Sequence, residues 1–169
     1  MRWAIWAPLL VAALLAQAGP LARHLPPELR PDPVLLLALF AAARAEPAEA
    51  LGFCWLAGLG RDLLSAGPLG EYALLYLAAG LGVTQLRRLL DARLPVVQAA
   101  SAFLAYSFVE GICLGTTLLA CGNRQLASHV GELISGALVT AAAAPLLCWG
   151  LGFLARPLGL NRRRWAQVG

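Results

Sequence analysis

Long apolar runs separated by short polar breaks fill most of the chain. Proline marks several of the breaks, at Glu46-Pro47, Gly67-Pro68 and Arg156-Pro157. Because a helix rises about 1.5 Å per residue, a run of roughly 20 apolar residues crosses the hydrocarbon core of a bilayer. The pattern predicts six transmembrane helices, approximately at residues 3–22, 32–45, 48–64, 69–90, 94–120 and 130–155.

The second apolar run is the shortest. Its apolar part extends only from Val34 to Ala43, and it follows a polar loop that is rich in proline. At about 1.5 Å per residue this part covers only about half of a hydrocarbon core roughly 30 Å thick. We expect a helix that is short, tilted or partly shielded by its neighbours, and a candidate docking surface.

The first run imitates a secretory signal peptide, with Arg2 before it and small residues from Ala16 to Gly19 near its end. No secreted soluble domain follows in the sequence. A retained first helix is therefore the simpler interpretation.

Composition agrees with a membrane protein. The chain is 60% hydrophobic and only 13% charged over 169 residues, which leaves too little polar surface for a soluble fold. Six spans also leave no room for a soluble domain of ~100 residues. We expect a single transmembrane helical domain, all-α and polytopic.

The basic residues are all arginine and lie mostly at the ends of the runs. This scattering indicates topology signals and contacts with the lipid bilayer, and it predicts no nucleic acid partner. With six spans, nine arginines against four fall on the side of the termini, and short arginine-rich loops stay in the cytoplasm. Both termini are therefore expected in the cytoplasm. The absence of lysine and the excess of alanine and leucine are typical of a GC-rich bacterial genome, so the protein is expected in a bacterial inner membrane.

Arg61 and Asp62 are adjacent full charges at the end of the third run. A carboxylate in hydrocarbon costs a few kcal/mol unless it is paired or hydrated. Two interpretations remain open: the pair caps the helix at the interface, with Asp62 accepting bonds from backbone amides, or it contacts a partner or ligand.

A turn follows the pair, between Ser65 and Gly70. Gly67 and Gly70 permit positive φ, and Pro68 interrupts the helix. Irregular backbone at membrane depth needs a cover of protein or water. The turn is thus either a surface loop or a partly re-entrant element, and it is expected at the outer face.

Glu110 lies deep in the fifth run. Helical spacing places Tyr106, Ser107 and Thr117 on the same stripe, which must face other helices. The adjacent Gly111-Ile-Cys-Leu-Gly115 predicts close approach of a neighbouring backbone. An intramembrane carboxylate is a functional candidate, and a structural interhelical hydrogen bond is an equally open interpretation.

No catalytic or cofactor motif is present. The chain has no GxSxG, HExxH or phosphate loop, and its four cysteines and two histidines show no metal-ligand spacing. Asp62 is expected near the outer face and Glu110 nearer the middle, which argues against an aspartyl-type pair. We expect no enzyme activity, no cofactor and no metal.

A resemblance to a known family begins at Pro31 and ends near Leu90. Pro31-Asp32 opens the short second helix, Gly52 lies in the third, and Gly58-Leu-Gly-Arg-Asp62-Leu-Leu-Ser-Ala-Gly67-Pro-Leu-Gly70 follows, closed by Ala73 and Leu74. This stretch, about a third of the chain, resembles the rod shape-determining protein MreD family. Glu110 lies outside the matching pattern.

The resemblance implies a non-catalytic scaffold of the cell-elongation complex. Its implied partners are MreC and, directly or indirectly, MreB, RodA and the partner transpeptidase of RodA, with a homo-oligomer possible. The fold is also similar to the small six-helix substrate-binding components of energy-coupling-factor vitamin transporters. A substrate-binding component of that kind is the alternative function.

Overall fold

The structure is a computed structural model that describes residues 3–19, 23, 26, 29–65, 67–87, 94–121 and 126–155. Over this part the chain is all-helical, and each of the six predicted runs contains one helix. The helices are α1 (Trp3–Ala18), α3 (Pro33–Arg44), α4 (Pro47–Asp62), α5 (Glu71–Leu86), α6 (Pro95–Cys121) and α7 (Leu126–Ala155). Residues 20–22 and 88–90, which the prediction assigned to spans, lie outside the described residues.

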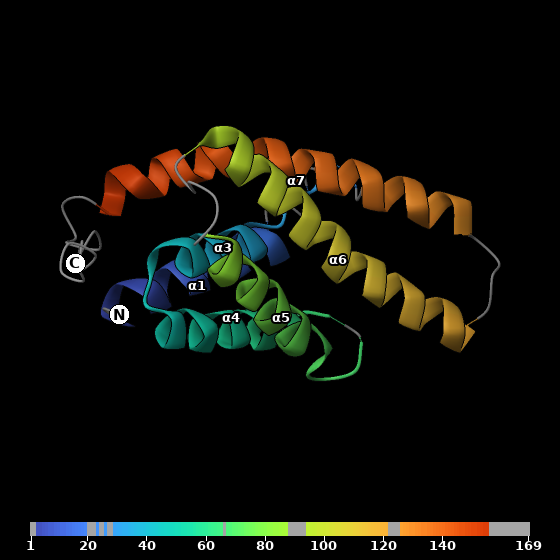
Figure 1. The fold of residues 1–169 in the computed structure, drawn as a ribbon. Helices are drawn as coiled ribbons and strands as arrows, with labels where there is room; N and C mark the ends of the chain where they lie inside the picture. Colours follow the sequence, from blue (N-terminus) through green and yellow to red (C-terminus); the bar gives the residue numbers. More distant parts are fainter. Residues whose placement is uncertain are drawn as a thin grey trace.

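Helix α3 lies at the centre of the molecule. It packs against α1, α4, α5, α6 and α7, and every residue from Val34 to Ala42 is buried. Figure 1 shows α7 along the top of the molecule and α6 running diagonally beneath it, beside the shorter helices. The expected shielding of this short helix is confirmed, but its expected role as a docking surface is wrong because its neighbours cover that surface.

Local chemistry explains where α3 begins and ends. Asp32 precedes Pro33 as the N-cap, and its side chain accepts a hydrogen bond from the backbone amide of Leu35. Proline suits this first position because its missing amide has no partner there in any helix. The helix stops at Ala45, whose backbone is extended just before Glu46-Pro47.

Among the described residues, two helices are long and apolar enough to cross a membrane by length and composition. They cover Pro95–Leu119 and His129–Gly152, with mean hydropathies of 1.5 and 1.7. The other described helices have 12 or 16 residues. At about 1.5 Å per residue a 16-residue helix is about 24 Å long, short of a core of roughly 30 Å.

Glycines bring α4 and α5 into close contact. A Cβ atom on Gly58 would lie 2.7 Å from the backbone nitrogen of Ala73, and one on Gly80 would lie 2.7 Å from Cys54 Sγ. The prediction for Gly111 and Gly115 is wrong for this chain, because a Cβ atom on either would meet nothing within 4 Å. The close helix approach therefore occurs at Gly58, inside the motif that ends in the turn.

Candidate functional site

Asp62 is the last residue of α4 and caps the neighbouring helix. It is 2% exposed, and its carboxylate accepts three backbone N–H groups from the start of α5. These are the amides of Gly70 at 3.1 Å, Tyr72 at 3.0 Å and Ala73 at 3.1 Å. A carboxylate at a helix N-terminus satisfies unpaired donors and is favoured by the helix dipole. The expected bonds from Asp62 to backbone amides of the turn are confirmed, but the capped helix is α5 and not the helix that carries Asp62, and Arg61 takes no part in the cap.

The turn itself depends on glycine and on the end of α4. Gly70 adopts φ 99°, in the left-handed region that favours glycine. The Ser65 amide and hydroxyl both donate to the backbone carbonyl of Asp62, each at 3.1 Å. Gly67 and Pro68 are exposed between these two fixed points. The turn is therefore tied at both ends to a single buried residue.

Asp32 gathers a second set of contacts at the start of α3. Its carboxylate accepts the Leu35 amide at 2.9 Å and the Tyr76 hydroxyl at 2.7 Å. Its backbone amide donates to Thr140 Oγ1 on α7 at 3.3 Å. Pro31 comes directly before it and holds the chain out of a helical conformation there. Asp32 thereby joins α3, α5 and α7.

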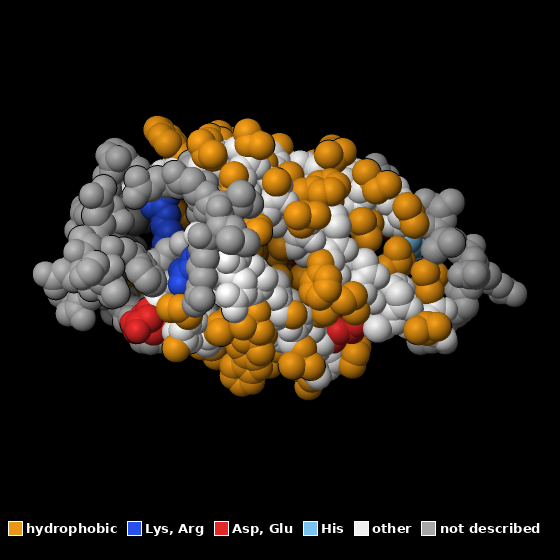
Figure 2. Space-filling model, in the orientation of Figure 1, with side chains coloured by type: hydrophobic (Ala, Val, Ile, Leu, Met, Phe, Trp, Pro, Cys, Tyr) orange, Lys and Arg blue, Asp and Glu red, His pale blue; other side chains and the backbone are white. Residues whose placement is uncertain are grey.

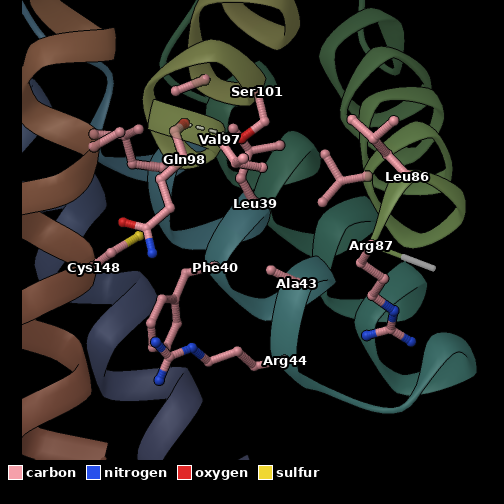
Figure 3. A pocket seen from close by; sticks show the side chains of 14 residues that line it. Leu39, Phe40, Ala43, Arg44, Leu86, Arg87, Val97, Gln98, Ser101 and Cys148 are labelled. Atoms are coloured by element: carbon pink, nitrogen blue, oxygen red, sulfur yellow. Dashed lines mark hydrogen bonds between the residues drawn. The ribbon is translucent and has the colours of Figure 1, made fainter. Parts of the chain in front are cut away.

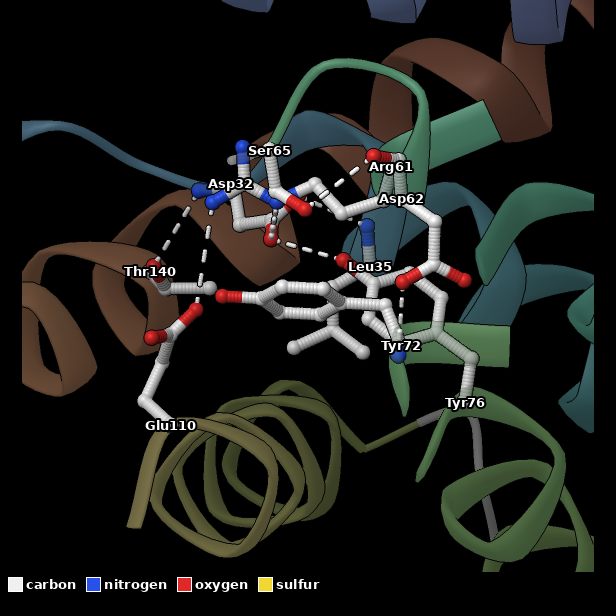
Figure 4. A network of polar contacts seen from close by, with 9 residues as sticks. All are labelled: Asp32, Leu35, Arg61, Asp62, Ser65, Tyr72, Tyr76, Glu110 and Thr140. Atoms are coloured by element: carbon white, nitrogen blue, oxygen red, sulfur yellow. Dashed lines mark hydrogen bonds and ion pairs between the residues drawn. The ribbon is translucent and has the colours of Figure 1, made fainter. Parts of the chain in front are cut away.

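Arg61 stands between two carboxylates. Its Nε lies 3.9 Å from Asp32 Oδ2 and its Nη2 lies 3.9 Å from Glu110 Oε1 on α6. The guanidinium also lies over the ring of Tyr72, 5.2 Å from the centroid. Figure 4 shows these side chains close together, although they come from α4, α5, α6 and the residue before α3. We call Asp32, Arg61, Tyr76, Glu110 and Thr140 the polar network.

The geometry separates the roles of the adjacent charges. Asp62 turns to the amides of the turn, whereas Arg61 turns to the polar network, so the pair does not act as one unit. Arg61 lies at the end of α4, just before the turn, and its side chain reaches Glu110. Its carboxylate faces Arg61 while that of Asp62 faces backbone amides, so the contacts do not make an aspartyl-type pair.

The predicted polar stripe of α6 divides in the structure. Glu110 joins the polar network, whereas the Tyr106 hydroxyl packs against α7 at Gly136. Thr117 donates to the carbonyl of Cys113 in its own helix at 2.8 Å. Ser107 is half-buried, and no contact joins it to the described members of the network. Of this stripe, Glu110 alone makes a network contact among the described residues.

Sequence reasoning missed Tyr72, Tyr76 and Thr140. The two tyrosines are four residues apart on α5, and their rings meet edge to face with centroids 6.2 Å apart. That spacing places them on one helix face, which is a usable signal. Thr140 is a single polar residue in an apolar run, and its contact with Asp32 spans 108 residues. Nothing local in the sequence indicates that pairing.

The side chains of the site hold neighbouring helices together. One cation and two carboxylates lie among tyrosine rings, while the remaining carboxylate is saturated by backbone donors. No group of three metal-ligating side chains occurs among the described residues. Arg61 Nε is buried without a hydrogen-bond partner in that same part of the chain. The arrangement fixes helices relative to one another.

Comparison with known proteins gives one match. A family model described as rod shape-determining protein MreD matches residues 1–149, nearly the whole chain and more than the segment that carried the resemblance. No curated protein and no solved structure matches the chain.

Proposed function

The chain belongs to the MreD family of rod shape-determining proteins, and we propose that it is a non-catalytic membrane scaffold of the bacterial cell-elongation complex. The family gives a role in rod-shape determination and places the chain among the membrane proteins of the cell-shape system. The proposal adds the arrangement in the membrane and the partners.

In the proposed arrangement all six described helices cross the inner membrane, and both termini lie in the cytoplasm. The turn between α4 and α5 then faces outward. The proposed direct partner is MreC, and RodA with its partner transpeptidase and MreB are reached directly or through it. Exposed apolar side chains support the placement of the helices in the membrane, since Leu119, Leu146 and Trp149 are 90%, 73% and 78% exposed.

The observation that carries the scaffold function is an exposed apolar turn on a rigid base. Leu63, just before the turn, and Leu69, within it, are each 77% exposed, and Leu64 is 46% exposed. Beneath them Asp62 holds three backbone amides. A preformed apolar surface binds a partner at a lower entropic cost than a mobile one. We propose Leu63, Leu64 and Leu69 as the contact surface for MreC.

The alternative, a vitamin-binding transporter component, finds no support in the comparisons. The polar groups at this end of the bundle also bond to one another. Asp32, Asp62 and Tyr76 are buried with partners within the chain. A small-molecule site needs polar groups that converge on open space.

The test is recovery of MreC with the tagged full-length chain from membranes in mild detergent. Leu69→Ser is expected to lower the recovery of the MreC of the same bacterium by about tenfold, as for loss of ~1.4 kcal/mol at an interface anchor. Val96→Ser is the matched control, because Val96 is equally exposed at 77% but lies in the first turn of α6. Equal recovery with both variants would remove the turn as the contact surface.

A further inference from the structure

Helices α4 and α5 are much shorter than α6 and α7. Each of the two has 16 residues, a length of about 24 Å. The apolar parts of the long helices, Pro95–Leu119 and His129–Gly152, are about 35 Å long. A hydrocarbon core is roughly 30 Å thick. The long helices fit it by tilting, and α6 runs diagonally in Figure 1, whereas tilt only reduces the span of a short helix.

The exposed side of α4 and α5 is apolar. The two helices pack against each other, and Trp55, Leu56, Leu74 and Leu81 on them are 39% to 64% exposed. We call these side chains the short face. Figure 2 shows hydrophobic side chains over these lower helices, with acidic side chains near both ends of the area. An apolar band between polar ends complements hydrocarbon between two headgroup layers, so lipid is the occupant of this face.

Polar residues limit the length of the short face. Glu46 is exposed just before α4, and its side chain makes no capping bond. Glu71 begins α5, and its carboxylate accepts a hydrogen bond from the Thr116 hydroxyl. Gln85 is exposed near the other end of α5. The exposed stripe of α5 between Leu74 and Gln85 therefore rises only about 17 Å, well short of a core of roughly 30 Å.

The contacts of α6 show at which end the short helices stop early. At one end, the last turns of α3 and α5 and the first turns of α6 line a common groove, where Figure 3 shows Arg87 and Gln98. At the other end, Thr116 meets Glu71 at 2.8 Å, and α6 continues about 8 Å past this contact to Cys121. The difference in length thus falls at the end of the turn, which faces outward in the proposed arrangement.

We propose that the short face thins the bilayer beside it, chiefly in the outer leaflet, and selects lipids with short acyl chains. The proposal rests on the membrane arrangement given above, in which α4 and α5 cross the membrane. A bilayer thins locally around a hydrophobic stretch that is shorter than its core. Without thinning, the Glu71 carboxylate would lie in hydrocarbon, which is the costlier alternative. Helices α6 and α7 require no thinning, so the effect is confined to one side of the protein.

The first arm of the test uses two native tryptophans as reporters. Trp55 on α4 is 44% exposed and Trp149 on α7 is 78% exposed, whereas Trp6 is 3% exposed and out of reach of lipid. Two variants of the full-length chain keep Trp6 and one reporter, and phenylalanine replaces the remaining tryptophans. Each is reconstituted in an equal mixture of two phosphatidylcholines whose cores are about 20 Å and about 30 Å thick. Bromine, which quenches tryptophan fluorescence on contact, is placed on one lipid and then on the other.

Short-chain lipid should be enriched about twofold or more at Trp55 and not at Trp149. Trp149 is the matched control, because it reports on a long helix of the same protein in the same bilayer. Equal quenching of Trp55 by the two lipids would overturn the proposal, and so would equal enrichment at both reporters. Quenching of Trp55 by neither lipid would mean that a second copy of the chain covers the short face, which also overturns it.

The second arm changes the length of the short face. Gln85→Leu replaces an exposed polar residue near the end of α5 and lengthens the apolar stripe there, so the enrichment at Trp55 should fall toward equal quenching. Gln85→Asn keeps an amide at the same position and should retain the enrichment. Unchanged enrichment in Gln85→Leu would show that length does not select the lipid. Labelling of the turn in cells tests the crossing of α5, and recovery of MreC tests the scaffold function, so the three failures are distinguishable.

Discussion

Asp62 stabilises a helix to which it does not belong. Helix α5 has Gly70 at its N-cap, and glycine offers no side-chain acceptor for the first amides. The buried carboxylate of Asp62 supplies that acceptor from the end of α4, with three bonds of 3.0 to 3.1 Å. Asp62 and the Gly-Pro-Leu-Gly segment of the motif therefore form the cap of α5 together.

Asp62→Ala removes all three acceptor contacts at once. An unsatisfied buried donor costs ~1–3 kcal/mol, so we expect a loss of roughly 3 kcal/mol or more in the free energy of unfolding. The apolar helices remain, so the variant should still reach the membrane while MreC recovery falls. Thermal unfolding in detergent and membrane abundance measure these two effects.

Ser65→Ala is the control for Asp62→Ala. It removes only the hydrogen bond from the Ser65 hydroxyl to the backbone carbonyl of Asp62. The bond from the Ser65 backbone amide to the same carbonyl remains. Its expected cost is about 1 kcal/mol or less. If Asp62→Ala unfolds at the same temperature as Ser65→Ala, the carboxylate of Asp62 does not hold the start of α5 in place.

Arg61 and Glu110 should respond unequally to neutral substitution. Arg61→Gln leaves Asp32 and Glu110 without their common cation, and breaking a buried ion pair costs about 3–5 kcal/mol. Arg61 and Glu110 are about one-quarter exposed at 24% and 23%, so solvent screening should reduce this loss to roughly 1–3 kcal/mol.

Glu110→Gln keeps the contact between Arg61 and Asp32, so it should cost less than Arg61→Gln. Thermal unfolding of both single variants in the same detergent gives the order. A larger loss from Glu110→Gln would mean that Glu110, and not Asp32, holds Arg61 in place.

Part of the site could be predicted from the sequence. Adjacent charges before a glycine-proline turn made bonds from Asp62 to backbone amides of the turn one of two open interpretations, because local spacing determines which amides Asp62 can reach. The partners of Asp32 could not be predicted in this way. Tyr76 and Thr140 lie 44 and 108 residues away, and only the packing of three helices brings them together.

At the scale of elements, the contact between α4 and α5 depends on Gly58. A Cβ atom there would lie 2.7 Å from the nitrogen of Ala73, in the first turn of the helix that Asp62 caps. The missing side chain lets the two backbones approach closely enough for the cap to form. Gly58 and Asp62 are four residues apart and so lie on the same face of α4.

Gly58→Ala should therefore be destabilising. We expect a loss of ~1–3 kcal/mol, typical of overpacking, in addition to weakening of the Asp62 bonds. Gly52→Ala is the matched control, because a Cβ atom there meets nothing within 4 Å. In a helix this control should gain up to about 1 kcal/mol. Chemical or thermal unfolding compares the two, and equal effects would show that the contact at Gly58 is not limiting.

The length of α3 was predictable but its environment was not. Pro31-Asp32 and Glu46-Pro47 mark its ends in the sequence. Its apolar composition, however, is equally compatible with contact to lipid. Burial on all sides follows from the way five other described helices surround it, and no pattern within twelve residues contains that information. The close helix contact predicted at Gly111 and Gly115 was wrong for the same reason, since a motif of small residues does not show which helix lies next to it.

At the scale of the whole molecule, the proposed topology puts the turn between α4 and α5 and the start of α6 on opposite sides of the membrane. Pro68 lies in the exposed turn, and Val96 lies in the exposed first turn of α6. In a variant with all four native cysteines replaced by alanine, Pro68→Cys should react with an impermeant maleimide in cells whose outer membrane has been opened. Val96→Cys should react only after the inner membrane is permeabilised.

The reverse labelling pattern would invert the proposed orientation and put the turn between α4 and α5 on the cytoplasmic side. Labelling of both positions from the outside would mean that α5 does not cross the membrane, and the six-span arrangement would then be wrong. Because α5 has 16 residues, it is one of the helices for which this measurement is most informative.

The hydrogen bond between the Asp32 amide and Thr140 cannot form until α7 has been synthesised. These two residues are 108 positions apart, so Asp32 is made long before its partner on α7 exists. At roughly 5–20 residues per second, the ribosome needs about 5 to 20 s to reach Thr140. During that interval the Asp32 amide lacks its acceptor on α7, and the side of the central helix that α7 covers is open. The packing around α3 is therefore completed only after α7 has been made.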